Sequence, residues 1–109
     1  MIILNAHDDF RWRTGTPLIL VECKNWSSNC GKNELVQFRA KIENRRDQCR
    51  LGFLISWNGF ADTVTKELLR GSRDEIVIGL ISGENLKATA TTGSILPAFQ
   101  TAWEAAVLD

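Results

Sequence analysis

Glu22 and Lys24 close an aliphatic run, Leu18 to Val21, and their types and spacing could carry chemistry. On a β-strand, residues two positions apart point to the same face, so these two side chains would lie together. A carboxylate can hold a metal ion, and a neighbouring ammonium can stabilise negative charge that develops on a phosphate. Isolated charges are costly to bury, so a phosphodiesterase site is one interpretation of the pair, and it depends on the sequence that follows. The alternative is an ordinary strand end that reaches water.

Composition places the chain among small globular proteins. Its 109 residues suffice for one domain, and its hydrophobic content of 44% and charged content of 24% are typical of that class. No apolar run approaches the roughly 20 residues that cross a bilayer, and the first residues lack a signal-peptide pattern. Cys23, Cys30 and Cys49 form no paired metal motif, and only His7 could assist them. We therefore expect no membrane partner and free thiols in a reducing cytoplasm.

The charge of the chain is unevenly distributed, although its formal net charge is zero. Between Arg11 and Arg50, nine Lys or Arg side chains stand against four acids, a net charge of +5, and the Glu22–Lys24 pair lies inside this segment. Basic residues around a site would attract phosphate. A solvated helix face is the alternative interpretation.

Hydrophobic spacing predicts the elements that position these residues. It favours strands over residues 2–6, 18–24, 51–57 and 75–81, and helices over 32–46, 61–70 and 94–108. Asn33 is the predicted cap of the first helix. Residues 82–84 are expected to form a turn, and a short helical or irregular stretch is expected to begin at Leu86. The order predicts an α/β fold whose mixed sheet has a hairpin leading into crossover-connected parallel strands.

Four sequence blocks carry a family resemblance over residues 18–87. They are Val21-Glu22-Cys23-Lys24-Asn25-Trp26, then residues 31–38 (GKNELVQF), 51–60 (LGFLISWNGF) and 76–86, where SGENL stands in place of a typical D-G-E-x-L. In order and spacing the chain resembles the PD-(D/E)xK restriction-endonuclease-like superfamily, and within it the Mrr-like type IV restriction enzymes. The resemblance implies a three-layer fold, a mixed sheet flanked by helices, and metal-dependent hydrolysis of duplex DNA in restriction or defence.

The resemblance also implies roles for particular residues. Glu22 and the backbone carbonyl of Cys23 would bind Mg²⁺ or Mn²⁺, since hard oxygen ligands suit such ions. Lys24 would orient the attacking water or stabilise the phosphorane. Gln37 would support the site from the first helix, although an ordinary exposed helix position is an equal alternative. A nucleophilic role for Cys23 with His7 is conceivable, but a thiol without a positioned base is usually inert.

Two tryptophans and a set of basic residues complete the expectations. Trp26 is expected in the core or as a base-stacking platform, and Trp57 in the core or at an interface. The residues expected to contact DNA are Lys32, Arg39, Arg45, Arg46 and Arg50.

The superfamily needs a further acid, opposite the E-x-K on the preceding strand. A hairpin folded about residue 12 or 13 would pair Glu22 with Ile3 and place Asp8 roughly 16 Å from Glu22. Because ligands lie about 2.1 Å from Mg²⁺, Asp8 is too distant, and the acid is expected at or just before Met1. We therefore expect a truncated nuclease that lacks its N-terminal helix, with a degenerate nuclease as the alternative.

The expected oligomeric state follows from the same argument. A sheet without its covering helix would expose apolar surface, which predicts a homodimer or higher oligomer. Two competing hypotheses remain. One is a non-catalytic module of the same fold that serves in oligomerisation or binds DNA through Arg39, Lys41, Arg45, Arg46 and Arg50. The other is a small α/β protein with no nucleic-acid role. Whether the basic side chains gather on the face of Glu22 and Lys24 distinguishes among them.

Overall fold

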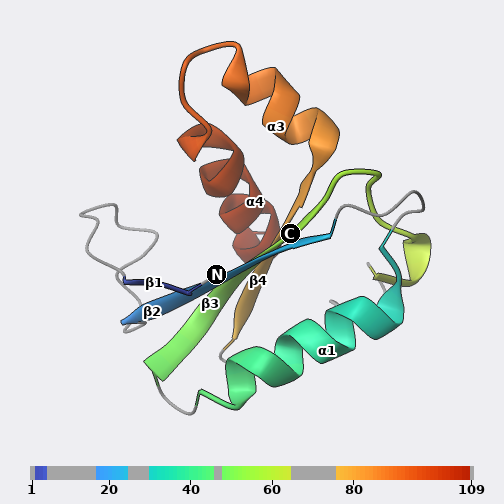
Figure 1. The fold of residues 1–109 in the computed structure, drawn as a ribbon, viewed down its shortest axis with the longest axis vertical. Helices are drawn as coiled ribbons and strands as arrows, with labels where there is room; N and C mark the ends of the chain where they lie inside the picture. The colour runs from blue at the N-terminus through green and yellow to red at the C-terminus, as the bar shows by residue number, and fades with distance from the viewer. Residues whose placement is uncertain (1, 5–16, 25–29, 46–47, 65–75, 109) are drawn as a thin grey trace.

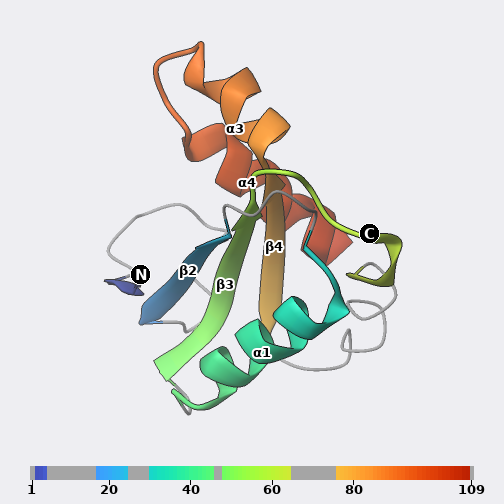
Figure 2. The same ribbon diagram turned by 45° about the vertical axis from the view of Figure 1, so that its right-hand side comes forward.

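The chain folds into three layers around one mixed sheet. The computed structural model describes residues 2–4, 17–24, 30–45, 48–64 and 76–108. Strands β1 (Ile2–Leu4), β2 (Leu18–Lys24), β3 (Cys49–Ser56) and β4 (Val77–Ser82) form a sheet in that order. Helix α1 (Lys32–Glu43) covers one face, while α4 (Leu96–Leu108), preceded by α3 (Gly83–Ala90), covers the other (Figure 1; Figure 2). The predicted three-layer α/β fold is confirmed.

The directions of the strands match the expected mixed sheet. β1 pairs with β2 antiparallel, whereas β2 with β3 and β3 with β4 are parallel. Parallel strands covered on both faces are near-continuously apolar, as the almost wholly buried β3 is. The hairpin register differs from the prediction, because Ile3 lies opposite Ile19 rather than Glu22. The observed partner of Ile3 lies three residues before the predicted one along β2. Because side chains alternate between the faces of a strand, a shift of three residues moves each β1 side chain to the opposite face of the sheet from the predicted one.

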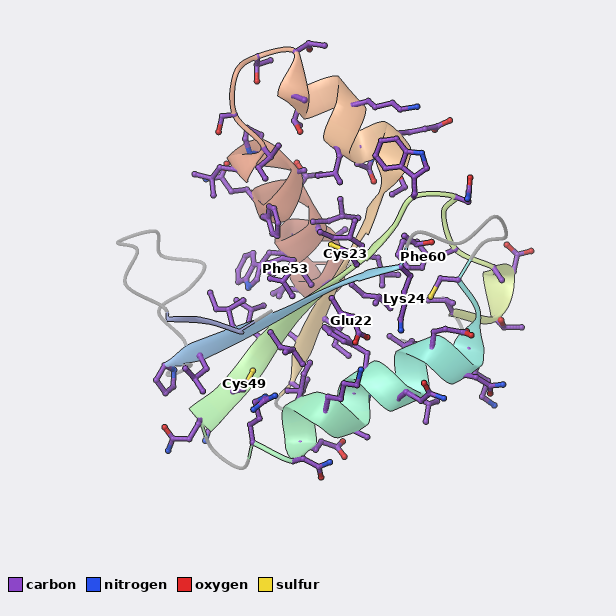
Figure 3. All side chains as sticks on the ribbon, viewed as in Figure 1. Glu22, Cys23, Lys24, Cys49, Phe53 and Phe60 are labelled. Carbon is purple, nitrogen blue, oxygen red and sulfur yellow. The ribbon has the colours of Figure 1, made fainter. Side chains whose placement is uncertain are left out.

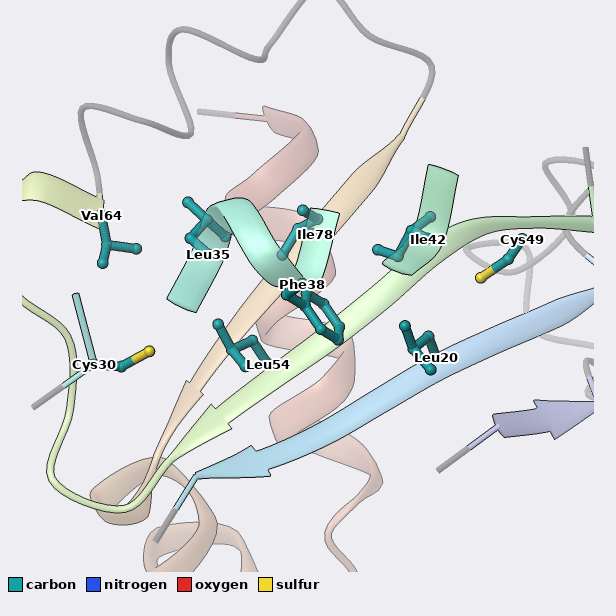
Figure 4. Close-up of a cluster of buried hydrophobic side chains, with 9 residues drawn as sticks. All are labelled: Leu20, Cys30, Leu35, Phe38, Ile42, Cys49, Leu54, Val64 and Ile78. Atoms are coloured by element: carbon teal, nitrogen blue, oxygen red, sulfur yellow. The ribbon is translucent and has the colours of Figure 1, made fainter. Parts of the chain in front are cut away.

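The core beneath α1 is built from the helix face that the sequence predicts (Figure 4). Leu35, Phe38 and Ile42 recur at helical spacing and are fully buried. They pack against apolar residues from the sheet and its connections: Leu20, Cys30, Cys49, Leu54, Val64 and Ile78. Gly52 allows the close approach of α1, because a Cβ atom there would lie 2.6 Å from Cδ1 of Ile42.

A second core lies beneath α4. Its buried members are Val21, Leu51, Phe53, Ile55, Ile81, Ala98 and Ala102. The rings of Phe53 and Phe99 meet edge to face, with centroids 4.8 Å apart and an interplanar angle of 78°. Such pairs contribute about 0.5–1.5 kcal/mol beyond their buried area.

Two helix starts differ from the prediction. Gly31, not Asn33, is the N-cap of α1, and its backbone N–H donates to Oε2 of Glu34 at 2.9 Å. Helix α3 begins at Gly83, directly after β4, where a turn was predicted. There the Asn85 N–H donates to Oγ of Ser82 at 3.2 Å, and Oδ1 of Asn85 accepts from the Ser82 N–H at 3.1 Å. This reciprocal capping satisfies donors that a helix end leaves unpaired.

The remaining predicted elements differ mainly at their ends. Helix α1 ends at Glu43, and β1 is described only over Ile2–Leu4. Of the helix predicted over 61–70, residues 62–64 are helical, and residues 65–75 lie outside the described part of the chain.

Candidate active site between β2 and α1

Glu22 and Lys24 share the face of β2 that lies under α1 (Figure 3). Cys23, between them, points to the opposite face, as the strand period requires. The Nζ atom of Lys24 lies 3.8 Å from Oε2 of Glu22, and each side chain is 22% exposed. The pair is thus half-buried at the rim of the core, where Coulomb interactions are stronger than in bulk water.

Lys41 is a third charged member of this site. It lies in the last turn of α1, and its Nζ donates to Oε1 of Glu22. The sequence predicts Lys41 only as a DNA contact of a non-catalytic module and gives no link to Glu22. The available signal was its position four residues after Gln37, which puts both side chains on the same flank of the helix. Gln37 itself is exposed.

On the neighbouring strands β3 and β4, the residues in register with Glu22 are apolar and those in register with Lys24 are polar. In register with Glu22 lie Leu54 and then Leu80. In register with Lys24 lie Ser56 and then Ser82. Leu54 and Ser56 are both buried. The carboxylate therefore stands beside an apolar surface, while the ammonium stands at a hydroxyl-lined end of the sheet.

The oxygen donors at this site suit a hard cation. The Lys24 carbonyl accepts from the Trp57 N–H at 3.2 Å and so points towards β3. Successive carbonyls along a strand point to opposite sides, which directs the Cys23 carbonyl towards the β1 side, beyond Leu20, where the described β1 pairing ends. A carboxylate and a carbonyl fit Mg²⁺, which retains several waters and takes few protein ligands. Among the described residues, no group of three or more His, Cys, Asp or Glu side chains could hold a metal.

The basic side chains expected to contact DNA are spread around α1. At 100° per residue, Lys41 and Gln37 lie on one flank of the helix, and Lys32 and Arg39 lie on the other. Arg45 follows the end of α1 and Arg50 lies at the start of β3, at the far end of that strand from Ser56. Arg46 is outside the described residues. Among the residues that the structure describes, Lys24 and Lys41 form the ion pairs seen with Glu22.

A shallow pocket of about 350 Å³ borders the site at the end of β2 and β3. It is lined by Cys23, Lys24, Ile55, Trp57 and Leu86. Trp57 is 45% exposed, which rules out the core alternative and leaves the interface as the prediction for this residue. Its ring packs against Gly83 and lies 4.9 Å from Nζ of Lys87. Trp26, His7 and Asp8 lie outside the described residues.

The second strand of this mixed sheet carries a carboxylate and an ammonium on one face, beside a carbonyl oxygen. A carboxylate and a carbonyl can hold a divalent cation, and an ammonium can stabilise negative charge on a phosphate, so the fold and the site define a candidate phosphodiesterase domain. The family model described as restriction endonuclease (Mrr_cat) matches residues 6–90, more than half of the chain. The chain therefore belongs to this restriction endonuclease family, as the resemblance indicated.

Searches of curated proteins and of solved structures returned no match. The family match extends on both sides of residues 18–87 and includes Asp8. Within the described residues, no helix combines the length and apolar character needed to cross a membrane.

Proposed function

We propose that this domain hydrolyses phosphodiester bonds of duplex DNA with a bound Mg²⁺ or Mn²⁺, in restriction or genome defence. One observation carries the proposal: Glu22 and Lys24 lie half-buried on one face, with 3.8 Å between ammonium and carboxylate, in a chain of the restriction endonuclease family. That family membership implies DNA as the substrate.

The residues then take the following roles. The Glu22 carboxylate and the Cys23 carbonyl would hold the ion, which when bound supplies Lewis-acid activation of phosphate and water. Lys24 stabilises charge that builds on the phosphate during attack, and its half-buried position strengthens this interaction. Gln37, exposed on α1, supports the site from the helix side. Contacts to the DNA backbone are proposed for the basic set Lys32, Arg39, Arg45, Arg46 and Arg50.

The observed hairpin register supports a proposed position for a further acid beside Glu22. Ile2 lies opposite Leu20. Moving two residues along β2, from Leu20 to Glu22, corresponds to moving two residues back along β1, to the position just before Met1. Residues directly opposite each other on antiparallel strands share a face, so a carboxylate at that position would lie beside Glu22.

Nicking of supercoiled plasmid in Mn²⁺ tests the proposal. The proteins compared are the 109-residue protein, its Glu22→Ala variant, and a version with a short N-terminal extension that ends in Asp immediately before Met1. The matched control carries the same extension ending in Asn, which keeps the shape but removes the charge. We expect Glu22-dependent nicking that rises at least about tenfold with the Asp, because a second carboxylate tightens the metal site.

Two outcomes would count against catalysis through Glu22. If the Glu22→Ala variant still nicks the plasmid, the Glu22 carboxylate is not required for the reaction. Absence of nicking from all folded proteins, together with salt-sensitive DNA binding, would favour the alternative of a non-catalytic DNA-binding or assembly module.

The proposal includes a homodimer or higher oligomer in a reducing compartment such as the cytoplasm. Because α1 and α4 cover the two faces of the sheet, support for association comes from exposed large apolar side chains, which among the described residues are Val36, Trp57, Ile95 and Val107. Support for the compartment comes from three cysteines that carry no disulfide. Sedimentation of a monomer at micromolar concentration would contradict the oligomer.

A further inference from the structure

Both oxygens of Glu22 face an ammonium group. Oε1 accepts a hydrogen bond from Lys41 of α1, and Oε2 lies 3.8 Å from Lys24 of β2. The two cations differ in their settings, because the Lys24 side chain is 22% exposed and the Lys41 side chain is 49% exposed. Lys24 is the more buried of the two and lies on the same strand as Glu22, whereas Lys41 reaches the carboxylate from α1, on the more exposed side of the site.

An oxygen that binds Lys41 is a poor metal ligand until Lys41 leaves. The ammonium occupies the lone-pair region that a directly coordinated ion needs, and its charge also repels an approaching divalent cation. The hydrogen bond itself is a partly exposed ion pair, which contributes little and is readily broken. Lys41 can therefore orient the Glu22 carboxylate and still dissociate from it.

We propose that Lys41 is a positioning residue that competes with the metal ion for Glu22 and is released when a DNA phosphate becomes its partner. The inference rests on the proposed function. A phosphate near the site offers Lys41 a charge-assisted hydrogen bond in place of the carboxylate. DNA binding then frees Oε1 and raises metal affinity, and by linkage the metal raises DNA affinity by the same factor.

A merely structural role for Lys41 makes a different prediction. If the Lys41–Glu22 pair only ties α1 to β2, then Lys41→Met lowers stability without tightening metal binding. In the competition proposal the same substitution leaves a folded protein that binds metal more tightly. Metal affinity, measured apart from catalysis, separates the two.

The test measures Mn²⁺ binding from the EPR signal of free Mn²⁺, with and without a short DNA duplex whose integrity is checked by gel. The variants are Lys41→Met, the charge-keeping Lys41→Arg, Glu22→Ala, and Lys87→Met as a matched loss of a lysine from α3, which lies on the other side of the sheet. Thermal unfolding of each protein confirms that it is folded.

We expect Lys41→Met to bind Mn²⁺ about threefold to tenfold more tightly than the parent in the absence of DNA. Adding the duplex should tighten Mn²⁺ binding in the parent and do so less in Lys41→Met. Lys41→Arg and Lys87→Met should behave like the parent. Equal Mn²⁺ affinity in the parent and Lys41→Met, in proteins whose binding needs Glu22, would overturn the competition while leaving the proposed function intact. Mn²⁺ binding that Glu22→Ala leaves unchanged would instead remove the proposed metal site, and this inference with it.

Discussion

Individual thiols of this chain sit in contrasting environments. Burial raises the pKa of the Cys30 thiol, and the nearby Glu34 carboxylate raises it further. Cys49 is also buried, whereas Cys23 is exposed at the end of β2. Because the thiolate is the reactive form and needs access, the three cysteines should differ strongly in reactivity.

Thiol labelling with a chromogenic disulfide at pH 8 tests this difference. We expect one fast-reacting group, lost in Cys23→Ser, while Cys30 and Cys49 react only when the protein unfolds. Stability should also depend on Cys30 at high pH. The folded protein holds the Cys30 proton more tightly than the unfolded chain does, so this contribution is present below the ordinary thiol pKa of about 8.5 and is lost as pH rises above it. The free energy of unfolding, measured with urea at rising pH, should therefore fall less steeply for Cys30→Ala than for the parent. An identical fall in the two proteins would contradict a raised pKa at Cys30.

At the same scale, the site shows which residues a sequence can predict. The strand period was enough to put Glu22 and Lys24 on one face. Lys41 could not be assigned in this way, because its contact with Glu22 depends on how α1 crosses the sheet. That crossing is set by tertiary packing of Phe38 and Ile42 on Gly52, which no local pattern encodes.

At the scale of elements, α4 approaches β4 closely because Gly79 lacks a side chain. A Cβ atom at Gly79 would lie 2.7 Å from Cδ1 of Phe53 and 3.1 Å from Cβ of Ala102. Both neighbours are buried, so neither can move into solvent. We expect Gly79→Ala to lower the free energy of unfolding by about 1–3 kcal/mol, the range for overpacked cores.

A double-mutant cycle identifies the cause of that loss. Urea unfolding is measured for Gly79→Ala, for Phe53→Leu and for the two combined. If the clash with the Phe53 ring is responsible, Gly79→Ala should cost less in the Phe53→Leu background. Strictly additive effects would place the strain elsewhere.

The elements also show where sequence patterns were insufficient. β2 and β3 were predicted well because strands buried on both faces form uniform apolar runs. The sequence predicts a turn where α3 begins, since Ser and Gly are common in turns as well as at helix caps. The β1–β2 register was wrong because a long connection leaves the pairing to tertiary packing rather than to a defined short turn.

At the scale of the molecule, α1 is the exposed layer nearest the candidate site, and its basic residues lie on both flanks. Lys41 stands on the flank beside Glu22, and Lys32 and Arg39 stand on the other. An α-helix is about 10–12 Å across with its side chains, close to the roughly 12 Å width of the DNA major groove. A duplex lying along α1 would therefore bring phosphates to both flanks at once.

The salt dependence of DNA binding tests this docking geometry. We compare the parent with a Lys32→Gln/Arg39→Gln double variant in EDTA, which prevents metal-dependent cleavage. Each lost phosphate contact should reduce the slope of log affinity against log salt by about 0.9, so the double variant should lose close to twice that. Lys87→Gln should leave the slope unchanged, because α3 lies at the opposite end of the molecule from α1 (Figure 1; Figure 2). An unchanged slope in the double variant would remove Lys32 and Arg39 from the interface and confine the duplex to the flank of Lys41, where it could still reach Glu22 and Lys24.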